Sequence, residues 1–399
     1  MGKVTKMASG WEEAFGRDDL TEMIRKSVRG AIEEILDEEL QAALGAKRFE
    51  RVKDRKGYRH GSEPRKISTG LGEVTMLVPR GRMFGKSEGM EEWESQVLPR
   101  YVRRTGRVDA AILGVYLAGA NTRRIKGALS PLLKDAPLSK SAVSRIVGRL
   151  KEVFSDWRKR PLAEEDLAYL YLDALGLKIR LAKKIVRVPV HAVMGVKRTG
   201  EKVLVDLRLL AQEASASWGV VVEDLIGRGL KNPELVIIDG NPGLRNAIEA
   251  NWPKVPVQRC TVHKLRNLLI HSPKHIREEV KEDYRQIVYA EDGAKAKEAH
   301  QKFIEKWKKI CPGIVTSLRE AGDELLTFYR FPEAQWKSLR TTNLIESVNK
   351  EFRRRVKTQG LFPDEDAALV LLYGLFASGQ IKLRRIDGFR TIAQIRRAA

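Results

Sequence analysis

The sequence predicts a mixed α/β core, preceded by helical and β-hairpin modules. Beyond residue 160, short apolar runs alternate with patterns of helical spacing, which indicates strands and helices built around one sheet. Before residue 160, apolar residues recur mainly at helical spacing, with one stretch that alternates like a hairpin. The length of 399 residues leaves room for two or three domains and a sizeable core.

The N-terminal part is expected to hold three modules. Residues 11–46 read as helix because their apolar side chains recur at helical spacing. Residues 66–80 read as two short strands around Gly70 to Gly72, followed by a mobile Gly-, Glu- and Lys-rich linker at 81–95. Three more helices are expected at 108–120, at 121–130 with Asn121-Thr122 as its cap, and at 139–150 with Ser139 as its cap.

The last three helices resemble a helix-turn-helix module, which places a recognition helix in the major groove of DNA. The candidate DNA contacts are Lys140, Ser141, Ser144 and Arg145 on the recognition helix, and Arg123 and Arg124 on the helix before it. An ordinary helical hairpin is the alternative interpretation.

The remaining elements define the core. Strands are expected at about 168–174, 176–182, 186–195, 203–210, 234–238 and 255–260, and helices at about 214–228 and 242–251. Successive strands followed by helix, strand, helix and strand are typical of an RNase H-like mixed sheet. Residues 261–335 would form an all-helical insertion before the helix that carries Glu346, and another apolar helix is expected at 364–376.

The expected domain boundaries follow from these elements. They are an N-terminal helical region at 1–55, a β-hairpin and linker at 56–100, a helix-turn-helix domain at 101–155, the first part of the core at 160–260, the helical insertion at 261–335, the final core helix at 336–360 and a C-terminal helical region at 361–399.

The charge balance favours a nucleic-acid partner. The chain has 74 Lys and Arg against 52 Asp and Glu, a formal net charge of +22, and phosphate neutralisation rewards such an excess. A soluble protein that is merely basic is the alternative. The sequence has no apolar run of about 18 residues and no signal peptide, so we expect a cytoplasmic protein without a membrane partner. Two cysteines do not make a disulfide framework.

Three acidic residues are the candidate catalytic and metal-binding groups. Asp173 interrupts an apolar run, Asp239 ends another just before Gly240, and Glu346 lies early in a helix. A carboxylate in apolar surroundings is costly unless it is paired or binds a metal. In the predicted sheet Asp173 and Asp239 lie on neighbouring central strands, and a packed helix brings Glu346 to them.

Oxygen ligands of this kind suit Mg²⁺ or Mn²⁺, and two such ions can activate the attacking and leaving oxygens of a phosphodiester. Gly240 is expected where backbone approaches metal or DNA. Each acid alone has an ordinary explanation: Asp-Gly is often a turn, a lone Asp is often solvated, and Glu near a helix start stabilises the helix dipole. Their joint placement is more specific.

Cationic side chains follow Glu346 on its own helix. Lys350, Arg353 and Arg354 share its helix face, and Arg355 and Lys357 extend the cluster. We expect them to clamp DNA phosphates, and a solvated basic face is the alternative.

Cys260 and His263 have the spacing of half a zinc site. A structural zinc site needs four ligands, and the other cysteine, Cys311, is isolated, so we expect no zinc. Cys260 is expected at a strand end with His263 beside the site. His263, Lys264 and Arg266 are expected to touch DNA or orient a ligand, and a structural histidine is the alternative.

Several strings resemble the bacterial Mutator-type insertion-sequence transposases. They are Tyr58-Arg-His-Gly61, Leu71-Gly-Glu-Val, Val78-Pro79-Arg80, Tyr171-Leu-Asp173-Ala, Ile237-Ile-Asp239-Gly240, Val257-Gln-Arg-Cys260-Thr-Val-His263-Lys-Leu-Arg266-Asn267, Thr341-Thr-Asn343-Leu-Ile-Glu346-Ser-Val-Asn349-Lys350 and Lys357-Thr-Gln-Gly360-Leu-Phe-Pro363. The string around Asp173 is not specific alone.

The resemblance implies DDE transposase chemistry on an RNase H-like fold, with Asp173, Asp239 and Glu346 as the triad and Cys260 and His263 as a signature. Asn343 and Asn349 belong to the same signature around Glu346. It further implies Mg²⁺ dependence, binding of terminal inverted repeats and target DNA, and at least a homodimer, associated with the nucleoid when bound to DNA. A DNA-binding regulator derived from an inactive transposase and an RNase H-like nuclease or resolvase remain alternatives.

Overall fold

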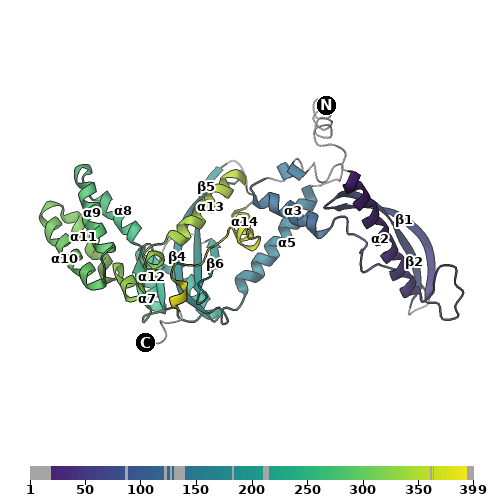
Figure 1. Ribbon diagram of the computed structural model, residues 1–399, viewed down its shortest axis with the longest axis horizontal. Coiled ribbons are helices and arrows are strands. Elements are labelled where there is room, and N and C mark those ends of the chain that lie inside the picture. Colours follow the sequence, from purple (N-terminus) through teal and green to yellow (C-terminus); the bar gives the residue numbers. More distant parts are fainter. Residues whose placement is uncertain are drawn as a thin grey trace, which may run out of the picture. The chain divides into compact units, whose positions relative to one another are not determined.

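The structure is a computed structural model that describes residues 19–85, 89–120, 124–125, 128–129, 140–181, 184–209, 215–359, 362 and 364–392. Contacts divide the chain into two compact units, one formed by residues 1–116 and 122–146 and the other by residues 117–121 and 147–399. Strands and helices alternate in a mixed α/β architecture (Figure 1). Each unit is described by itself below.

The first unit is built from a helix laid along a β-hairpin. Helix α2 (Asp19–Leu44) covers strands β1 (Gly57–Thr69) and β2 (Gly72–Phe84), and the short strand β3 (Met90–Glu92) pairs with the end of β2. The apolar side chains between them are Leu36, Ile67, Val74, Met76, Val78 and Leu98. Gly72 turns the hairpin with a φ of +103°, a conformation that favours glycine.

The hairpin is longer than the sequence predicts, and much of the expected linker at 81–95 is strand. Residues 81–83 continue the ladder, with Gly81 opposite Arg59. Gly81 read as a linker residue, but a Cβ there would lie 2.5 Å from Leu40 Cδ1. The glycine is therefore needed for close packing of α2 on the hairpin, which the local pattern does not reveal.

Two helices follow, α3 (Gly106–Leu117) and α5 (Lys140–Lys159). They match two of the three helices expected in this region, although α5 continues nine residues past the predicted end at 150. Most of residues 121–139 lie outside the described residues. The expected middle helix and the Ser139 cap fall there, so the helix-turn-helix arrangement stays a prediction.

The second unit contains a five-stranded mixed sheet. Its strands are β4 (Leu167–Leu181), β5 (Lys184–Lys197), β6 (Lys202–Leu209), β7 (Leu235–Ile238) and β8 (Val257–Arg259), in the order β6-β5-β4-β7-β8. The first three pair antiparallel, whereas β4, β7 and β8 pair parallel. The prediction that the strands leading to Asp173 and Asp239 are central neighbours is confirmed.

One predicted break does not exist: residues 168–174 and 176–182 form the single strand β4. Gly176 is the first residue of the second predicted strand, and it pairs with Pro189 in an uninterrupted ladder. The space where its side chain would lie is filled by the Arg187 side chain from β5. Glycine here permits a close cross-strand contact instead of ending the strand.

Helices cover both faces of the sheet. Helices α6 (Ser215–Gly227) and α7 (Pro242–Asn251) pack on one face, and the core between them includes Leu170, Leu172, Trp218 and Ile248. Helix α13 (Asn343–Gln359) lies on the other face, beside α14 (Glu365–Ala377). Successive strand residues point to opposite faces, so the odd-numbered residues of β4 face α13.

The chain between β8 and α13 is helical, as predicted. It comprises α8 (Thr261–Ile270), α9 (Arg277–Val288), α10 (Gly293–Ile310), α11 (Pro312–Ala321) and α12 (Glu333–Leu339), with short 3₁₀ turns at Lys274–Ile276, Gly322–Leu325 and Thr327–Arg330. Helices α8 to α11 form a lobe of this unit around their own apolar core, which includes Tyr284, Phe303, Trp307 and Leu318 (Figure 1). Within the described part of the chain, no helix has the length and apolar character that crossing a membrane requires.

Candidate active site

Asp173 and Asp239 are brought together by strand register. Leu172 pairs with Ile238 in the parallel ladder of β4 and β7, so the two aspartates are the next residues on neighbouring strands and point to the same face. The backbone turns at once after Asp239, whose Oδ1 accepts a hydrogen bond of 2.9 Å from the Asn241 N–H. Asn241 then caps α7 by accepting from the Leu244 N–H.

Asp173 is a buried acid with little compensation. Its side chain is 8% exposed, and burial raises its pKa to about 7, with the negative charge of Asp239 as the next cause. The charge of Glu346 raises this pKa further, whereas His263 lowers it. Asp239, Glu346 and His263 therefore all lie within electrostatic reach of Asp173, so the three acids share one face of the sheet.

Helix α13 supplies a polar partner for Asp173. Asn349 Nδ2 donates a hydrogen bond of 3.2 Å to Asp173 Oδ2. The amide oxygen of Asn349 is buried and has no hydrogen-bond partner among the described residues. A buried acceptor without a donor is costly, and a cation or a polar group entering the site would relieve it.

Glu346 contacts α8. Its Oε1 lies 3.0 Å from Arg266 Nη1 and 3.4 Å from His263 Nε2. Across the described ranges of the chain, no three His, Cys, Asp or Glu side chains converge closely enough to form a metal-ion group. The arrangement is thus a carboxylate pair, Asp173 and Asp239, with Glu346 held beside it by two basic side chains.

Cys260 and His263 connect the starts of α8 and α13. The buried Cys260 Sγ accepts hydrogen bonds of 3.3 Å from Thr342 N–H and Oγ1, and Thr342 Oγ1 lies 3.3 Å from His263 Nδ1. Burial acts to raise the pKa of the Cys260 thiol, but hydrogen bonds with His263 and Thr342 outweigh it and lower that pKa. The hydrogen bond with Cys260 raises the pKa of His263. The cluster fixes the start of α13, the helix that carries Glu346.

Gly240 lies where a side chain would clash with Arg259. Its φ of +108° favours glycine, and a Cβ would lie 2.3 Å from Arg259 Nη2. Among the described residues, the close neighbour of this glycine is thus the Arg259 guanidinium, and the expected approach of metal or DNA stays a prediction.

No sequence pattern indicates the ion cluster beneath this turn, and Lys264, which was expected to touch DNA or orient a ligand, is buried in it. The side chains of Arg259 and Lys264 are only 4% and 2% exposed, and both bind the carboxylate of Glu320 on α11, at 3.0 and 2.5 Å. Glu320 lies 61 residues beyond Arg259 in a segment that reads as an ordinary surface helix, so no local pattern joins them. Thr342 was also missed, although it precedes a helix start, where hydroxyl side chains often act.

The predicted basic face of α13 is exposed. Lys350, Arg353 and Arg354 all reach solvent, and Arg354 pairs with Glu351 at 2.7 Å. Among the described residues, neither Lys350 nor Arg353 has an ion-pair partner. Asn343 is exposed at the first turn of the same helix.

The expected DNA contacts of the N-terminal part are located only partly. Ser141, Ser144 and Arg145 are exposed on α5, and Arg124 is exposed in a short helical stretch. Arg123 and the side chain of Lys140 lie outside the described residues.

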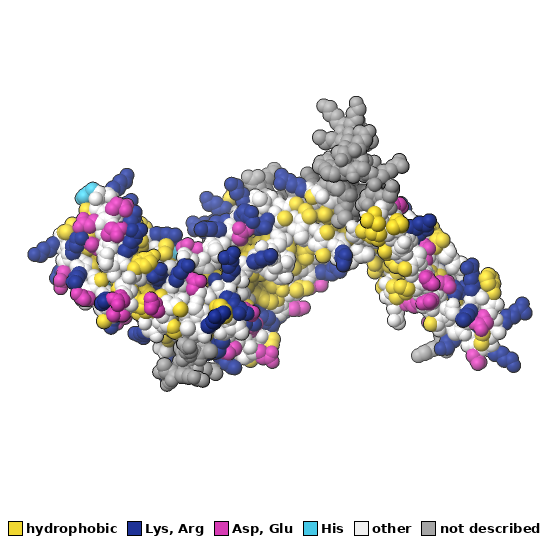
Figure 2. Space-filling view, viewed as in Figure 1, with side chains coloured by type: hydrophobic (Ala, Val, Ile, Leu, Met, Phe, Trp, Pro, Cys, Tyr) yellow, Lys and Arg dark blue, Asp and Glu magenta, His cyan; other side chains and the backbone are white. Residues whose placement is uncertain are grey.

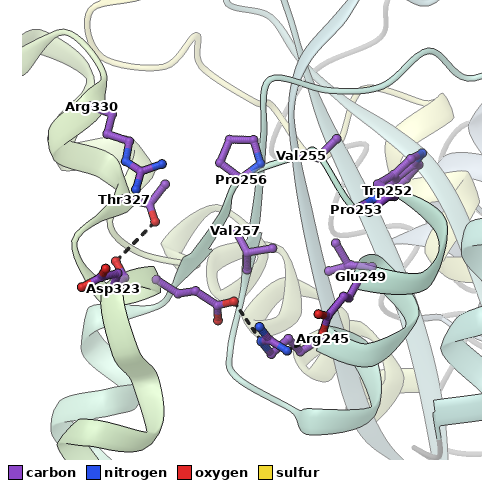
Figure 3. Close-up of a pocket in the computed structure, with 12 residues that line it drawn as sticks. Arg245, Glu249, Trp252, Pro253, Val255, Pro256, Val257, Asp323, Thr327 and Arg330 are labelled. Carbon is purple, nitrogen blue, oxygen red and sulfur yellow. Dashed lines mark hydrogen bonds and ion pairs between the residues drawn. The ribbon is translucent and has the colours of Figure 1, made fainter.

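A pocket of about 240 Å³ lies apart from the acids, between α7, β8 and the 3₁₀ turns that follow α11 (Figure 3). Several of the charged side chains that line the pocket pair with one another: Arg245 pairs with Glu249 at 2.7 Å and with Glu324 at 2.9 Å. The pocket therefore adds nothing to the candidate site.

Comparison with known proteins identifies the family of this chain. Residues 3–383 match the family model described as "Transposase, Mutator family". The chain is 32% identical over 352 residues to the transposase for insertion sequence element ISRM5 of Rhizobium meliloti, covering 88% of this chain and 86% of that protein. It is 33% identical over 354 residues to the transposase for IS406 of Burkholderia multivorans, covering 88% and 89%. For the IS905 transposase of Lactococcus lactis, the identity is 31% over 367 residues, covering 92% and 91%. The chain therefore belongs to the Mutator family of transposases.

Proposed function

We propose that this protein is a DDE transposase that cuts DNA at the ends of an insertion sequence and joins the freed 3′-hydroxyl to target DNA. The observation that carries the proposal is the gathering of Asp173, Asp239 and Glu346 on one face of the central strands. In this proposal the sheet is an RNase H-like core spanning residues 160–260 and 336–360, and residues 261–335 are its helical insertion.

The Asp173 and Asp239 carboxylates are oxygen ligands that fit a hard divalent cation such as Mg²⁺ or Mn²⁺, and the proposed chemistry would use two such ions. Asp173 and Asp239 are adjacent carboxylates whose mutual repulsion contributes to the raised pKa of Asp173, and the nearby Asn349 oxygen is buried without a partner. Both features favour a bound cation. When bound, such ions lower the pKa of an attacking hydroxyl and stabilise charge on the leaving oxygen.

The chain's own residues hold and orient this site. Asn349 fixes the Asp173 carboxylate through its Nδ2–H, and the turn at Asn241 fixes Asp239. In the first step, water attacks phosphorus and the bond to the 3′-oxygen breaks, leaving a 3′-hydroxyl. In the second step, that hydroxyl attacks phosphorus in the target strand and gives up its proton, while the bond to the target's 3′-oxygen breaks and this oxygen takes up a proton to leave as a hydroxyl.

Glu346 changes partners in this scheme. Its contact with the half-exposed Arg266 is available for exchange, because a DNA phosphate can take the guanidinium and free the carboxylate for the cation. His263 limits how far Glu346 can move, since it lies between Glu346 and Thr342. Lys350, Arg353 and Arg354 would then contact phosphates of the same DNA.

The remaining assignments follow from the family and the charge. The N-terminal part, with its proposed helix-turn-helix domain at 101–155, binds the terminal inverted repeats, and a homodimer or larger assembly joins two ends. The protein acts in the bacterial cytoplasm on nucleoid DNA.

A strand-transfer assay with Mg²⁺ tests the triad through Asp173→Asn. We expect loss of both cut and joined products, with an unchanged or raised melting temperature, because the substitution removes a poorly compensated buried carboxylate. The matched control is Asp156→Asn on α5, an exposed aspartate that should keep wild-type activity.

Three outcomes separate the alternatives. If Asp173→Asn still cuts and joins DNA, the proposal that Asp173, Asp239 and Glu346 form the catalytic triad is wrong. A wild-type protein that binds DNA but never cuts supports a regulator derived from an inactive transposase. Nicked products without joined ones support an RNase H-like nuclease or resolvase.

A further inference from the structure

The β4–β5 hairpin extends beyond the rest of the sheet. Strand β7 pairs with β4 only as far as Leu172, and β6 pairs with β5 only from Val190 onward. Among the residues that the structure describes, 176–181 and 184–189 therefore pair only with each other and form a two-stranded ribbon. We call this part the ribbon.

The ribbon is strongly basic. Residues 174–191 contain five Lys and Arg and no Asp or Glu. Lys178 and Arg187 lie directly opposite each other in the ladder, and both are exposed. In the described ranges neither has an ion-pair partner, so their charge is available to an external anion. Figure 2 shows Lys and Arg side chains gathered over the ends of β5 and α13.

The two faces of the ribbon differ. Leu175, Leu177 and Ile179 are at most 2% exposed, and they point to the face that α13 covers. Lys178 and Arg187 point to the opposite face, which we call the outer face. The buried side anchors the ribbon, while the outer face is free to bind.

Gly176 sets the position of Arg187. An alanine Cβ at residue 176 would lie 2.3 Å from Arg187 Nε and 2.8 Å from Nη2. The guanidinium therefore lies across the ribbon, next to the exposed Lys178. Two exposed cations thus lie on one surface of the ribbon, where each can contact a phosphate of a nucleic-acid backbone.

We propose that the outer face of the ribbon binds the phosphate backbone of duplex DNA, at a place separate from the basic face of α13. Lys178 lies five residues past Asp173, roughly 17 Å at the usual strand rise. It also points away from α13, so the two basic faces contact different stretches of DNA. The inference rests on the proposed function, and it adds a second DNA-binding surface to the same site.

The test replaces both outer-face cations, Lys178→Ala with Arg187→Ala, and measures binding of a short duplex of random sequence by fluorescence anisotropy across salt concentrations. The control removes two exposed lysines at the opposite end of the sheet, Lys231→Ala with Lys254→Ala. Both double substitutions remove two positive charges, so a difference in DNA binding between them must come from where the charges lie on the protein.

When log affinity is plotted against log salt concentration, we expect the slope of the ribbon variant to be smaller in magnitude by about 2. We also expect its affinity near 0.15 M salt to fall on the order of 30-fold. Gly176→Ala should have a smaller effect in the same direction, because it displaces the guanidinium without removing charge. A slope equal to that of the control variant would overturn the proposal.

Folding and chemistry are controlled separately. Lys178→Arg with Arg187→Lys keeps both charges and should keep the wild-type slope, which excludes misfolding as the cause. Binding is measured in an Asp173→Asn background, so a failed cleavage proposal leaves the binding result readable. Cutting and joining are assayed separately, with the ribbon substitutions in a chain that keeps Asp173. If that variant cuts element ends normally but loses joined products, the bound DNA is the target; if cutting falls as well, it is the element end.

Discussion

His191 on β5 illustrates how burial controls a single residue. It is 1% exposed, neither ring nitrogen has a hydrogen-bond partner in the described structure, and its ring meets Trp218 edge to face. Arg208 lies opposite on β6, but its charge is already paired with Asp206 and Asp224. Burial lowers the pKa of His191 to about 4.

This shift predicts a pH-dependent stability. The unfolded chain binds a proton near pH 6.5 and the folded chain only near pH 4, so the stabilisation is complete above 6.5 and is lost as the pH falls between these values. The loss is at most about 3 kcal/mol. Urea unfolding from pH 4 to 7 should show a shallower pH dependence for His191→Leu than for the wild type.

The exposed His275→Leu serves as the control and should keep the wild-type dependence. Parallel curves for the wild type and His191→Leu would show that the histidine is not buried in its neutral form.

At the scale of single residues, the sequence indicates which acidic residues are unusual, but it does not indicate which side chains they contact. The acids stand out because Asp173 and Asp239 interrupt or end apolar runs. The residues that contact the site do not stand out. Asn349 contacts Asp173 from 176 positions away in the chain, and Thr342 contacts Cys260 from 82 positions away. Sequence spacing carries no information about such contacts.

At the scale of elements, the ion cluster of Glu320, Arg259 and Lys264 joins α11 to the strand and helix next to Asp239. Burial lowers the pKa of Lys264, and Glu320 opposes that shift. Glu320→Gln would leave two buried cations without a carboxylate. We expect the free energy of unfolding to fall by about 1–3 kcal/mol, measured by chemical denaturation.

The matched control is Glu305→Gln, an exposed glutamate of α10, which should change stability by less than about 0.5 kcal/mol. Adding Lys264→Met to Glu320→Gln should restore part of the loss, because it removes one of the unpaired cations. If Glu320→Gln is as stable as the control, the cluster contributes no stability.

Helices and strands could be predicted where residues close together in the sequence determine where they begin and end. The helix predicted at 242–251 is confirmed by α7, because Asn241 is a good cap and Pro242 suits a first turn. The break predicted near Gly176 was wrong, because that glycine is explained by Arg187 on another strand. Glycine marks a special position, but the reason for it is set by tertiary packing.

At the scale of the whole molecule, the net charge of +22 predicts a strong dependence of DNA binding on salt. Each phosphate neutralised on a duplex contributes about −0.9 to the slope of log affinity against log salt. We expect anisotropy titrations between about 50 and 200 mM salt to show a steep linear fall. A flat response would contradict DNA binding by the basic surfaces.

The arrangement of the sheet was predictable to a useful degree. The order of strands and helices after residue 160 indicates a sheet in which the strands leading to Asp173 and Asp239 are adjacent, and the strand order confirms it. The ion pair between Glu320 on α11 and Arg259 was not predictable, because the sequence of a helical segment does not indicate which surface the helix will cover.

The parallel register of β4 and β7 limits which mutations the gene can tolerate. Asp173 faces α13 only because it follows Leu172, which pairs with Ile238. A deletion of one codon within residues 168–172 would keep an apolar strand but turn the carboxylate toward the α6 side. The number of codons before Asp173 is thus a stricter requirement than the identity of the apolar residues they encode.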